Sequence, residues 1–150
     1  MAKIDKCSER ILQELESNGR ISNVEFADVA GLSLSACLRR VQELERVGII
    51  KGYRAVLNKT DLGVGFTVFI AVGLSDLTTK SILAFEKAIT RSKQVRECHN
   101  IIGTVEYLLR VETADLAPCK VFRLENLGIL PQVNSVETSV VMDYSKDYRA

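Results

Sequence analysis

SNVEFADVAGLSLSACLRRVQELERVGIIKGY, residues 22–53, is the stretch that decides how the first part of this chain folds. Ser22 followed three residues later by Glu25 forms a capping box, which predicts the start of a short helix ending at Gly31. Ser33 is a suitable N-cap for a further helix that runs to about residue 46. A short helix, a glycine turn and a longer helix are the elements of a helix-turn-helix motif.

The residues on either side extend this motif. Upstream, Asp5 is a suitable N-cap, and apolar residues then recur at helical spacing until Asn18-Gly19, which predicts another helix. In the last helix Leu34, Cys37, Leu38, Val41 and Leu44 share one face and predict its contact with the core. Downstream, two short β-prone runs flank Lys51-Gly52 within residues 49–57 and predict a β-wing.

The outward face of the third predicted helix suits DNA. A helix fits the major groove, and its N-terminal half meets the base edges. Serine hydroxyls there can donate to phosphates or bases, and arginines can bind phosphates or the acceptor edge of guanine. The predicted DNA-binding residues are Ser33, Ser35, Ala36, Arg39, Arg40, Lys51 and Arg54. The alternative is a three-helix bundle whose arginines form a solvated face.

The remaining chain predicts a second domain. A polar connector at 58–63 is followed by an apolar strand at 66–74 and an amphipathic helix at 78–91. Strands at 95–102 and 104–112 meet in a tight hairpin at Gly103, a helix opens at Asp115, and a last strand spans 136–143. Strand, helix, strand, strand, helix, strand is the ferredoxin-like order. The predicted class is α+β: a winged helix-turn-helix at 1–60, then a ferredoxin-like βαββαβ sandwich at 61–150.

Such a sheet carries its helices on one face only. We expect the other face to expose apolar residues that a second copy covers, so the chain is predicted to form a homodimer.

Composition excludes several classes of protein. With 47% hydrophobic and 26% charged residues the chain is globular, and the net charge of +1 does not by itself indicate a nucleic-acid partner. No apolar run approaches the roughly 20 residues of a membrane span, and the N-terminus lacks a signal peptide. We therefore expect a soluble, cytoplasmic protein without membrane contact. The four cysteines form no C-x-x-C pair, so neither a zinc site nor another cofactor is predicted.

No catalytic constellation is recognisable in the second domain. It has no G-x-S-x-G motif and no glycine loop that would cradle a phosphate. His99, the single histidine, is interpreted as a structural residue beside acidic neighbours, with a general base as the alternative. The sequence thus predicts a protein that is not an enzyme.

Motifs along nearly the whole chain resemble the Lrp/AsnC family of leucine- and asparagine-responsive regulators. In the first domain they are Ile4-Asp5-Lys6, Ile11-Leu12, Asn18-Gly19-Arg20-Ile21-Ser22, Gly31-Leu32-Ser33, Cys37-Leu38-Arg39-Arg40-Val41, Leu44-Glu45 and Gly48-Ile49-Ile50-Lys51-Gly52-Tyr53. In the second they are Glu97-Cys98-His99, Gly103 with Glu106-Tyr107-Leu108-Leu109, Leu130-Pro131 and Val140-Val141-Met142.

The resemblance implies a transcription regulator of amino-acid metabolism that binds double-stranded DNA. It further implies homodimers that assemble into tetramers or octamers, with an amino acid or related metabolite bound between dimers. The positions matching the family's effector pocket are Gly103, Thr104, Glu106, Tyr107, Leu116, Gln132, Ser139, Val140 and Val141. For Glu106 an inter-subunit ion pair or a plain surface carboxylate is the alternative role.

Two other functions are open at this stage. Sirohaem decarboxylases resemble the same two-domain architecture, although this chain offers few basic residues for a tetrapyrrole's carboxylates. A ligand-binding module without direct DNA contact is the second alternative, which the Arg39-Arg40 helix disfavours.

Overall fold

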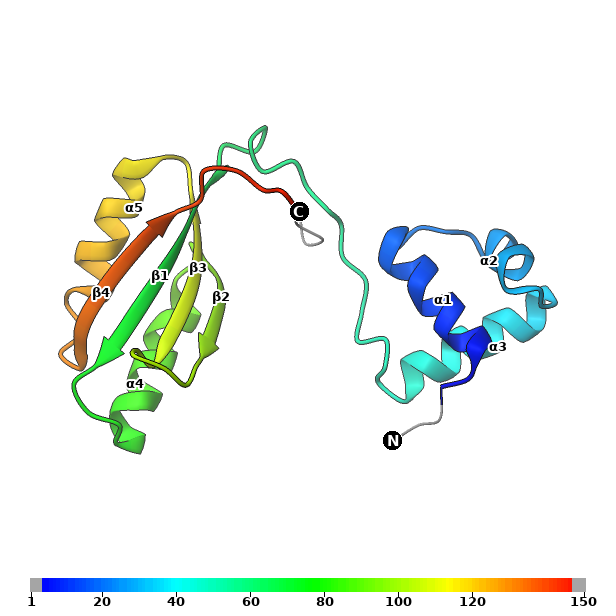
Figure 1. The fold of residues 1–150 in the computed structure, drawn as a ribbon, viewed down its shortest axis with the longest axis horizontal. Helices are drawn as coiled ribbons and strands as arrows, with labels where there is room; N and C mark the ends of the chain where they lie inside the picture. Colours follow the sequence, from blue (N-terminus) through cyan, green and yellow to red (C-terminus); the bar gives the residue numbers. More distant parts are fainter. Residues whose placement is uncertain (1–3, 147–150) are drawn as a thin grey trace. The chain divides into compact units, whose positions relative to one another are not determined.

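Local capping signals shape the N-terminal helices of the computed structural model, which describes residues 4–146 (Figure 1). Helix α1 (Lys6–Ser17) starts where the Asp5 carboxylate accepts a hydrogen bond from the Ser8 N–H at 2.9 Å. Helix α2 (Asn23–Ala30) has the predicted capping box, and Ser33 caps helix α3 (Leu34–Arg46). Between α2 and α3, Gly31 adopts a left-handed conformation with φ of +63°, which favours glycine. The predicted helix-turn-helix is confirmed.

The core of this unit is small and comes from all three helices. Its buried residues are Ile11, Phe26, Ala27, Ala30, Cys37, Val41 and Leu44. The prediction that Leu34 and Leu38 belong to this core is wrong, because they are 48% and 39% exposed. Both lie to one side of the line formed by Cys37, Val41 and Leu44, and three short helices bury only that line.

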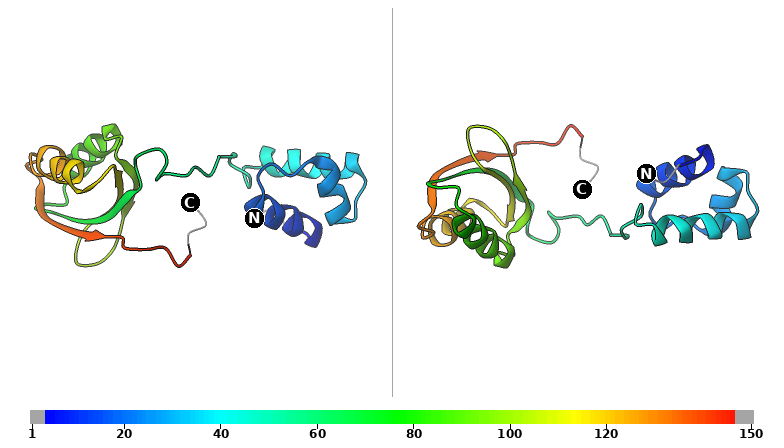
Figure 2. Two further views of the ribbon diagram at one scale, coloured as in Figure 1. Left: turned by 90° about the horizontal axis from the view of Figure 1, so that it is seen from above. Right: turned by 90° about the horizontal axis from the view of Figure 1, so that it is seen from below.

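The two predicted wing strands do not form. Residues 51–58 are extended and pair with no other strand among residues 4–146, as the views in Figure 2 show. Tyr53 and Val56 are 54% and 63% exposed, so the segment buries too little apolar surface to hold a ribbon together. A two-stranded ribbon packed on nothing else is marginal in water.

The second unit, which begins at Leu57, has the predicted βαββαβ order. Its elements are β1 (Phe66–Leu74), α4 (Thr79–Arg91), β2 (Val95–Asn100), β3 (Tyr107–Thr113), α5 (Leu116–Phe122), a π-helical turn η1 (Arg123–Leu127) and β4 (Val133–Val140). The four strands form one antiparallel sheet in the order β2-β3-β1-β4. Asn58, Lys59 and Asp61 belong to this unit, so the structural break lies just before the predicted boundary at 60/61.

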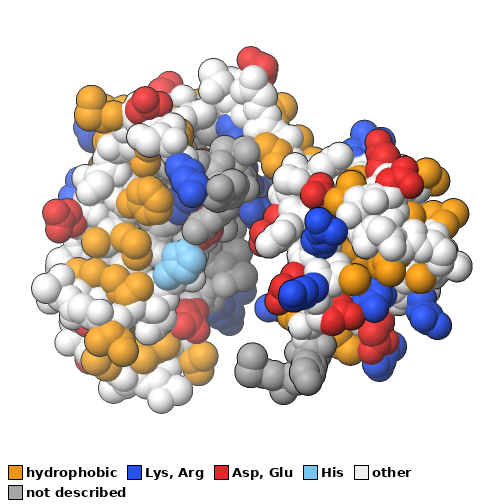
Figure 3. All heavy atoms as spheres, turned by 45° about the vertical axis from the view of Figure 1, so that its right-hand side comes forward, with side chains coloured by type: hydrophobic (Ala, Val, Ile, Leu, Met, Phe, Trp, Pro, Cys, Tyr) orange, Lys and Arg blue, Asp and Glu red, His pale blue; other side chains and the backbone are white. Residues whose placement is uncertain are grey.

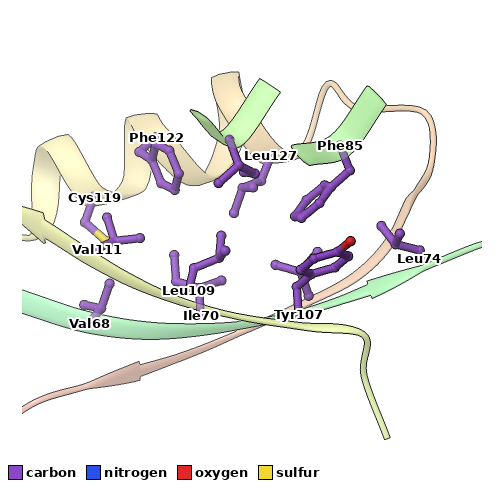
Figure 4. Packing of buried hydrophobic residues seen from close by; sticks show 12 residues of the cluster. Val68, Ile70, Leu74, Phe85, Tyr107, Leu109, Val111, Cys119, Phe122 and Leu127 are labelled. Carbon is purple, nitrogen blue, oxygen red and sulfur yellow. The ribbon is translucent and has the colours of Figure 1, made fainter. Parts of the chain in front are cut away.

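Both helices cover the same face of the sheet, and the core fills the space between (Figure 4). Val68, Ile70 and Val72 alternate along β1 and are buried in this core, as Tyr107, Leu109 and Val111 of β3 are. Phe85 from α4 and Phe122 from α5 close this core from above.

Strand ends differ from the predictions at two places. A six-residue connection, 101–106, replaces the tight hairpin at Gly103. The Ile101 N–H donates to the Glu106 carbonyl across this connection, and the Glu106 N–H donates to the Val72 carbonyl of β1. β4 spans 133–140 rather than 136–143, since a register shift between Gly73 and Leu74 brings Val133 opposite Leu74.

The open face of the sheet carries an ion network beside apolar residues, so the predicted apolar face is confirmed only in part. The Glu112 carboxylate, 1% exposed, contacts Lys59 Nζ at 2.5 Å, Arg96 Nε at 3.1 Å and Arg110 Nη2 at 3.2 Å. Arg110 also reaches Glu97 at 3.3 Å. Lys59 lies in the turn before β1, so the connector is held to the sheet by this ion network. Phe69, Ala71 and Leu108 are half-buried beside it.

None of the helices among residues 4–146 is long and apolar enough to cross a membrane. The same residues contain no cluster of three or more histidine, cysteine or acidic side chains that could hold a metal.

Candidate DNA-contacting helix and effector residues

The N-terminal end of α3 presents small polar groups. The Ser33 Oγ accepts from the Ala36 N–H at 3.3 Å and lies 3.3 Å from the Ser35 Oγ. Ser33 is therefore occupied as the helix cap, Ala36 is half-buried, and Ser35 is exposed and can still donate. This capped end leaves the first turn of α3 open to an anion, because free backbone N–H groups there favour negative charge.

The two adjacent arginines of α3 have different surroundings. Arg39 is exposed and makes no ion pair with any described residue. Arg40 points back to α1: its Nη1 lies 2.6 and 2.7 Å from the two Asp5 carboxylate oxygens and 3.2 Å from the Ser8 Oγ. The prediction placed both side chains outward, and the structure leaves only Arg39 unpaired there. Asp5 and Arg40 are 35 residues apart, and the spacing of residues within one helix does not indicate a contact over that separation.

Asp5 is held in its charged form. The backbone N–H of Ser8, followed by the Arg40 guanidinium, lowers the pKa of Asp5 from 3.8 to about 2. The carboxylate thus both caps α1 and neutralises Arg40. On the face of this unit that Figure 3 shows, Lys and Arg side chains are interspersed with acidic ones.

The chain after α3 carries the other two predicted DNA-binding residues. Lys51 and Arg54 are exposed in the extended segment. Tyr53 between them donates its hydroxyl to the Glu45 carboxylate of α3 at 2.8 Å. This bond, which sequence reasoning missed, holds the two cations beside the end of α3. The sequence feature that could have indicated this bond is the position of the aromatic Tyr53 between the basic Lys51 and Arg54.

The predicted effector residues fall into two groups. Gly103, Thr104, Glu106 and Gln132 lie where β1 ends: the Glu106 carboxylate accepts from the Leu74 N–H at 2.7 Å, and the Gln132 carbonyl accepts from the Ser75 N–H at 2.8 Å. Gly103 and Thr104 are exposed in the 101–106 connection. Gly73 lies beside this group, since a Cβ on it would crowd the Ser135 hydroxyl and come within 3.7 Å of the Glu106 carboxylate.

The second group lies at the opposite end of the sheet. Ser139 pairs with Phe69 and Val140 with Val68, whereas Glu106 contacts the Gly73–Leu74 end of β1. Four residues along a strand separate Phe69 from Gly73, a span of about 13 Å. The Val141 N–H bonds to Thr67 beyond them, and Leu116, 62% exposed, begins the helix that follows β3 at this same end. One chain therefore does not bring the nine residues together.

Tyr107 belongs to neither group. Its ring is 1% exposed and packs on Phe85 with centroids 4.6 Å apart, and its hydroxyl donates to the Glu86 carboxylate at 2.8 Å. Burial, together with Glu86, raises the pKa of Tyr107. A groove of about 380 Å³ between α4 and β2 reaches this hydroxyl and contains none of the other predicted effector residues.

His99 is a surface residue on the open face. Its Nε2 lies 2.9 Å from the Glu97 carboxylate, and its side chain is 53% exposed. The acidic neighbour that the sequence predicted is present.

A helix-turn-helix with a capped, outward-facing third helix, joined to a ferredoxin-like sandwich, defines a two-domain DNA-binding regulator. Residues 4–51 match the winged helix-turn-helix DNA-binding model, and residues 67–150 match the Lrp/AsnC ligand binding domain model. The chain belongs to the Lrp/AsnC family of transcription regulators.

Known relatives agree along almost the full chain. The leucine-responsive regulatory proteins of Escherichia coli K12 and Klebsiella pneumoniae are 38% identical over 143 residues, 95% of this chain and 87% of each relative. A Neisseria meningitidis transcriptional regulator solved with L-Met is 31% identical, with a TM-score of 0.93 over 97% of this chain and 94% of that one. An AsnC-family regulator from Agrobacterium tumefaciens is 25% identical, with a TM-score of 0.89 over 95% and 93%.

These relatives are transcription regulators and not enzymes, which decides against the sirohaem decarboxylase alternative. The match of residues 4–51 to a DNA-binding domain likewise decides against a sensing module that lacks DNA contact.

Proposed function

We propose that this chain is a cytoplasmic regulator that binds operator DNA through the N-terminal half of α3 and Arg39. The exposed, unpaired guanidinium beside the capped end of α3 is the observation that supports this most directly. In the proposed complex Ser35 and Ala36 face the major groove of the DNA together with Arg39. Lys51 and Arg54 contact the phosphates that flank this groove. Ser33 takes part through the helix end that it caps.

Arg39 provides the test. Arg39→Ala removes a free cation from the middle of α3, whereas Arg46→Ala removes one that pairs with Glu43 at 2.6 Å near its end. A base-reading arginine contributes about 1–3 kcal/mol, or roughly 5- to 150-fold in affinity. We expect Arg39→Ala to lose binding in this range and Arg46→Ala to stay within about twofold.

The DNA probes for this binding assay are obtained by selection from genomic fragments. Purified protein is incubated with fragmented DNA of its source organism at near-physiological salt, and the retained fragments are sequenced and used as probes. Enrichment of a few upstream regions supports a sequence-specific regulator. Retention of no fragment, or equal retention of all, would reject the function.

We also propose that an amino acid or related metabolite binds where copies of the sensing unit meet. The support is the division of the effector residues: Glu106 can hold an ammonium group at one end of the sheet, and Val140 and Val141 offer an apolar wall at the other. Homodimers assembled into tetramers or octamers would join the two groups. The L-Met complex of the Neisseria regulator is a precedent for this ligand class.

The effector is tested by thermal unfolding with each of the common amino acids. A ligand at 100 times its dissociation constant stabilises the folded state by about 2.7 kcal/mol. We expect one chemical type of amino acid to raise the melting temperature, and Glu106→Gln to lose that rise. Glu137→Gln, an exposed carboxylate on β4, is the matched control. No rise with any amino acid would reject the effector while leaving DNA binding intact.

A further inference from the structure

Asp5 and Arg40 form an ion pair that places a carboxylate against one of the two adjacent arginines of α3. All three recorded contacts of Arg40 use Nη1, with Asp5 at 2.6 and 2.7 Å and with Ser8 at 3.2 Å. The Arg40 side chain is 34% exposed and that of Asp5 53% exposed, so both groups stand at the surface. Nε and Nη2 of Arg40 make no recorded hydrogen bond within residues 4–146.

The carboxylate of this pair is held in position and in its charged form. The Asp5 carboxylate also accepts from the Ser8 N–H at 2.9 Å, so capping of α1 fixes it in place. Its pKa of about 2 keeps it ionised. An approaching phosphate therefore meets Arg39 as a free cation, but meets Arg40 together with a fixed anion.

DNA affinity that ignores sequence comes mainly from cations that displace counterions from phosphates. A cation already neutralised by a neighbouring carboxylate displaces none. We propose that Asp5 acts as a specificity-determining residue, which withholds Arg40 from phosphates and so weakens sequence-independent DNA binding. The inference rests on the proposed DNA-binding function.

Asp5→Asn tests the inference, because asparagine caps a helix as well as aspartate does but carries no charge. Binding to a duplex of random sequence is measured by fluorescence anisotropy over a range of salt concentrations. One additional phosphate contact steepens the slope of log K against log salt by about 0.9, which corresponds to about 8-fold tighter binding at 0.1 M relative to 1 M salt. We expect this gain for Asp5→Asn, and a smaller ratio between operator and random DNA.

Three companion variants make the result specific. Asp28→Asn removes a negative charge elsewhere in the same unit and should leave the slope unchanged. Asp5→Asn combined with Arg40→Ala should lose the gain, because the freed cation is gone. Arg40→Ala alone should keep the wild-type slope. Arg39→Ala should flatten it by about 0.9, because on a duplex of random sequence, which offers no cognate base, Arg39 contacts phosphate instead. Asp5→Ser, which also caps, replaces Asp5→Asn if a thermal melt shows that the latter is unfolded.

The inference is overturned if Asp5→Asn leaves the slope unchanged, or if Asp28→Asn or the double variant gains as much. It is equally overturned if Arg40→Ala flattens the slope as Arg39→Ala does, since Arg40 would then already contact a phosphate. In all these cases the wild-type protein still binds its operator. Failure of the wild type to bind any DNA would instead reject the proposed function.

Discussion

Replacing Glu112 by glutamine should destabilise the second unit more than any other single loss of charge on its sheet. The Glu112 side chain is 1% exposed and contacts Lys59, Arg96 and Arg110. Glutamine has almost the same shape, so packing is preserved and the change isolates the charge. Of the three cations, Arg110 then still contacts the Glu97 carboxylate, whereas Lys59 and Arg96 lose the ion pair that they make with Glu112.

The magnitude follows from the exposure of the partners. Removing one member of a buried ion pair costs about 3 to 5 kcal/mol, because the other charge is left without compensation. Here Arg96, with its side chain 50% exposed, can return to water, and Arg110, 6% exposed, keeps Glu97 at 3.3 Å. Because both effects reduce the cost, we expect Glu112→Gln to lower the free energy of unfolding by about 2 to 3 kcal/mol.

Urea denaturation followed by far-ultraviolet circular dichroism, at one fixed protein concentration, measures this loss. Fixed concentration matters because assembly contributes to apparent stability. Glu137→Gln removes an exposed carboxylate from β4 and should change stability by less than about 0.5 kcal/mol. A loss for Glu112→Gln no larger than that of the control would refute the reasoning, and the ion network would then be a surface feature without consequence for folding.

Three further predictions concern the helices and the core. Gly31→Ala should destabilise the N-terminal unit by about 1–2 kcal/mol in thermal melts, because Gly31 has φ of +63°, whereas Gly19→Ala, without a positive φ, should change little. Phe122→Ala should cost about 3–5 kcal/mol in urea denaturation, as the ring is 1% exposed in the core, and a loss below 1 kcal/mol would show that the cavity collapses. Because the pKa of Asp5 is lowered from 3.8 to about 2, its pairing favours the folded state above pH 4 and is lost as pH falls towards 2. The stability difference between wild type and Asp5→Asn, measured by melts from pH 5 to 2, should shrink across this window, and a constant difference would contradict it.

Features that depend on neighbours in the sequence could be predicted well. Asp5, Ser22 and Ser33 cap their helices as expected, because an N-cap is decided within three residues. The continuous apolar run at 66–74 likewise predicted the strand β1, although such a run does not indicate which side of the strand faces the core. The order of the elements then left few topologies to consider.

Features that depend on distant partners could not be predicted. Arg39 and Arg40 are adjacent and chemically identical in sequence, and only the position of α1 decides that one binds Asp5. The start of β4 depends on a register shift in β1, and the ion network on the open face depends on Lys59 folding back on Glu112. The resemblance to a family supplied the candidate effector residues without indicating that they lie at both ends of the sheet.

That separation has a consequence for how much protein is needed. A metabolite small enough to be an amino acid can touch Glu106 and Val140 only when they come from different copies. In the proposed effector site each bound metabolite requires an assembled interface, so diluting the protein should weaken its apparent affinity for the metabolite by mass action. A cell with few copies of the protein would need a high effector concentration for a response, and a cell with many copies would respond to a low concentration. The abundance of the regulator thereby becomes a second signal, read at the same site as the first.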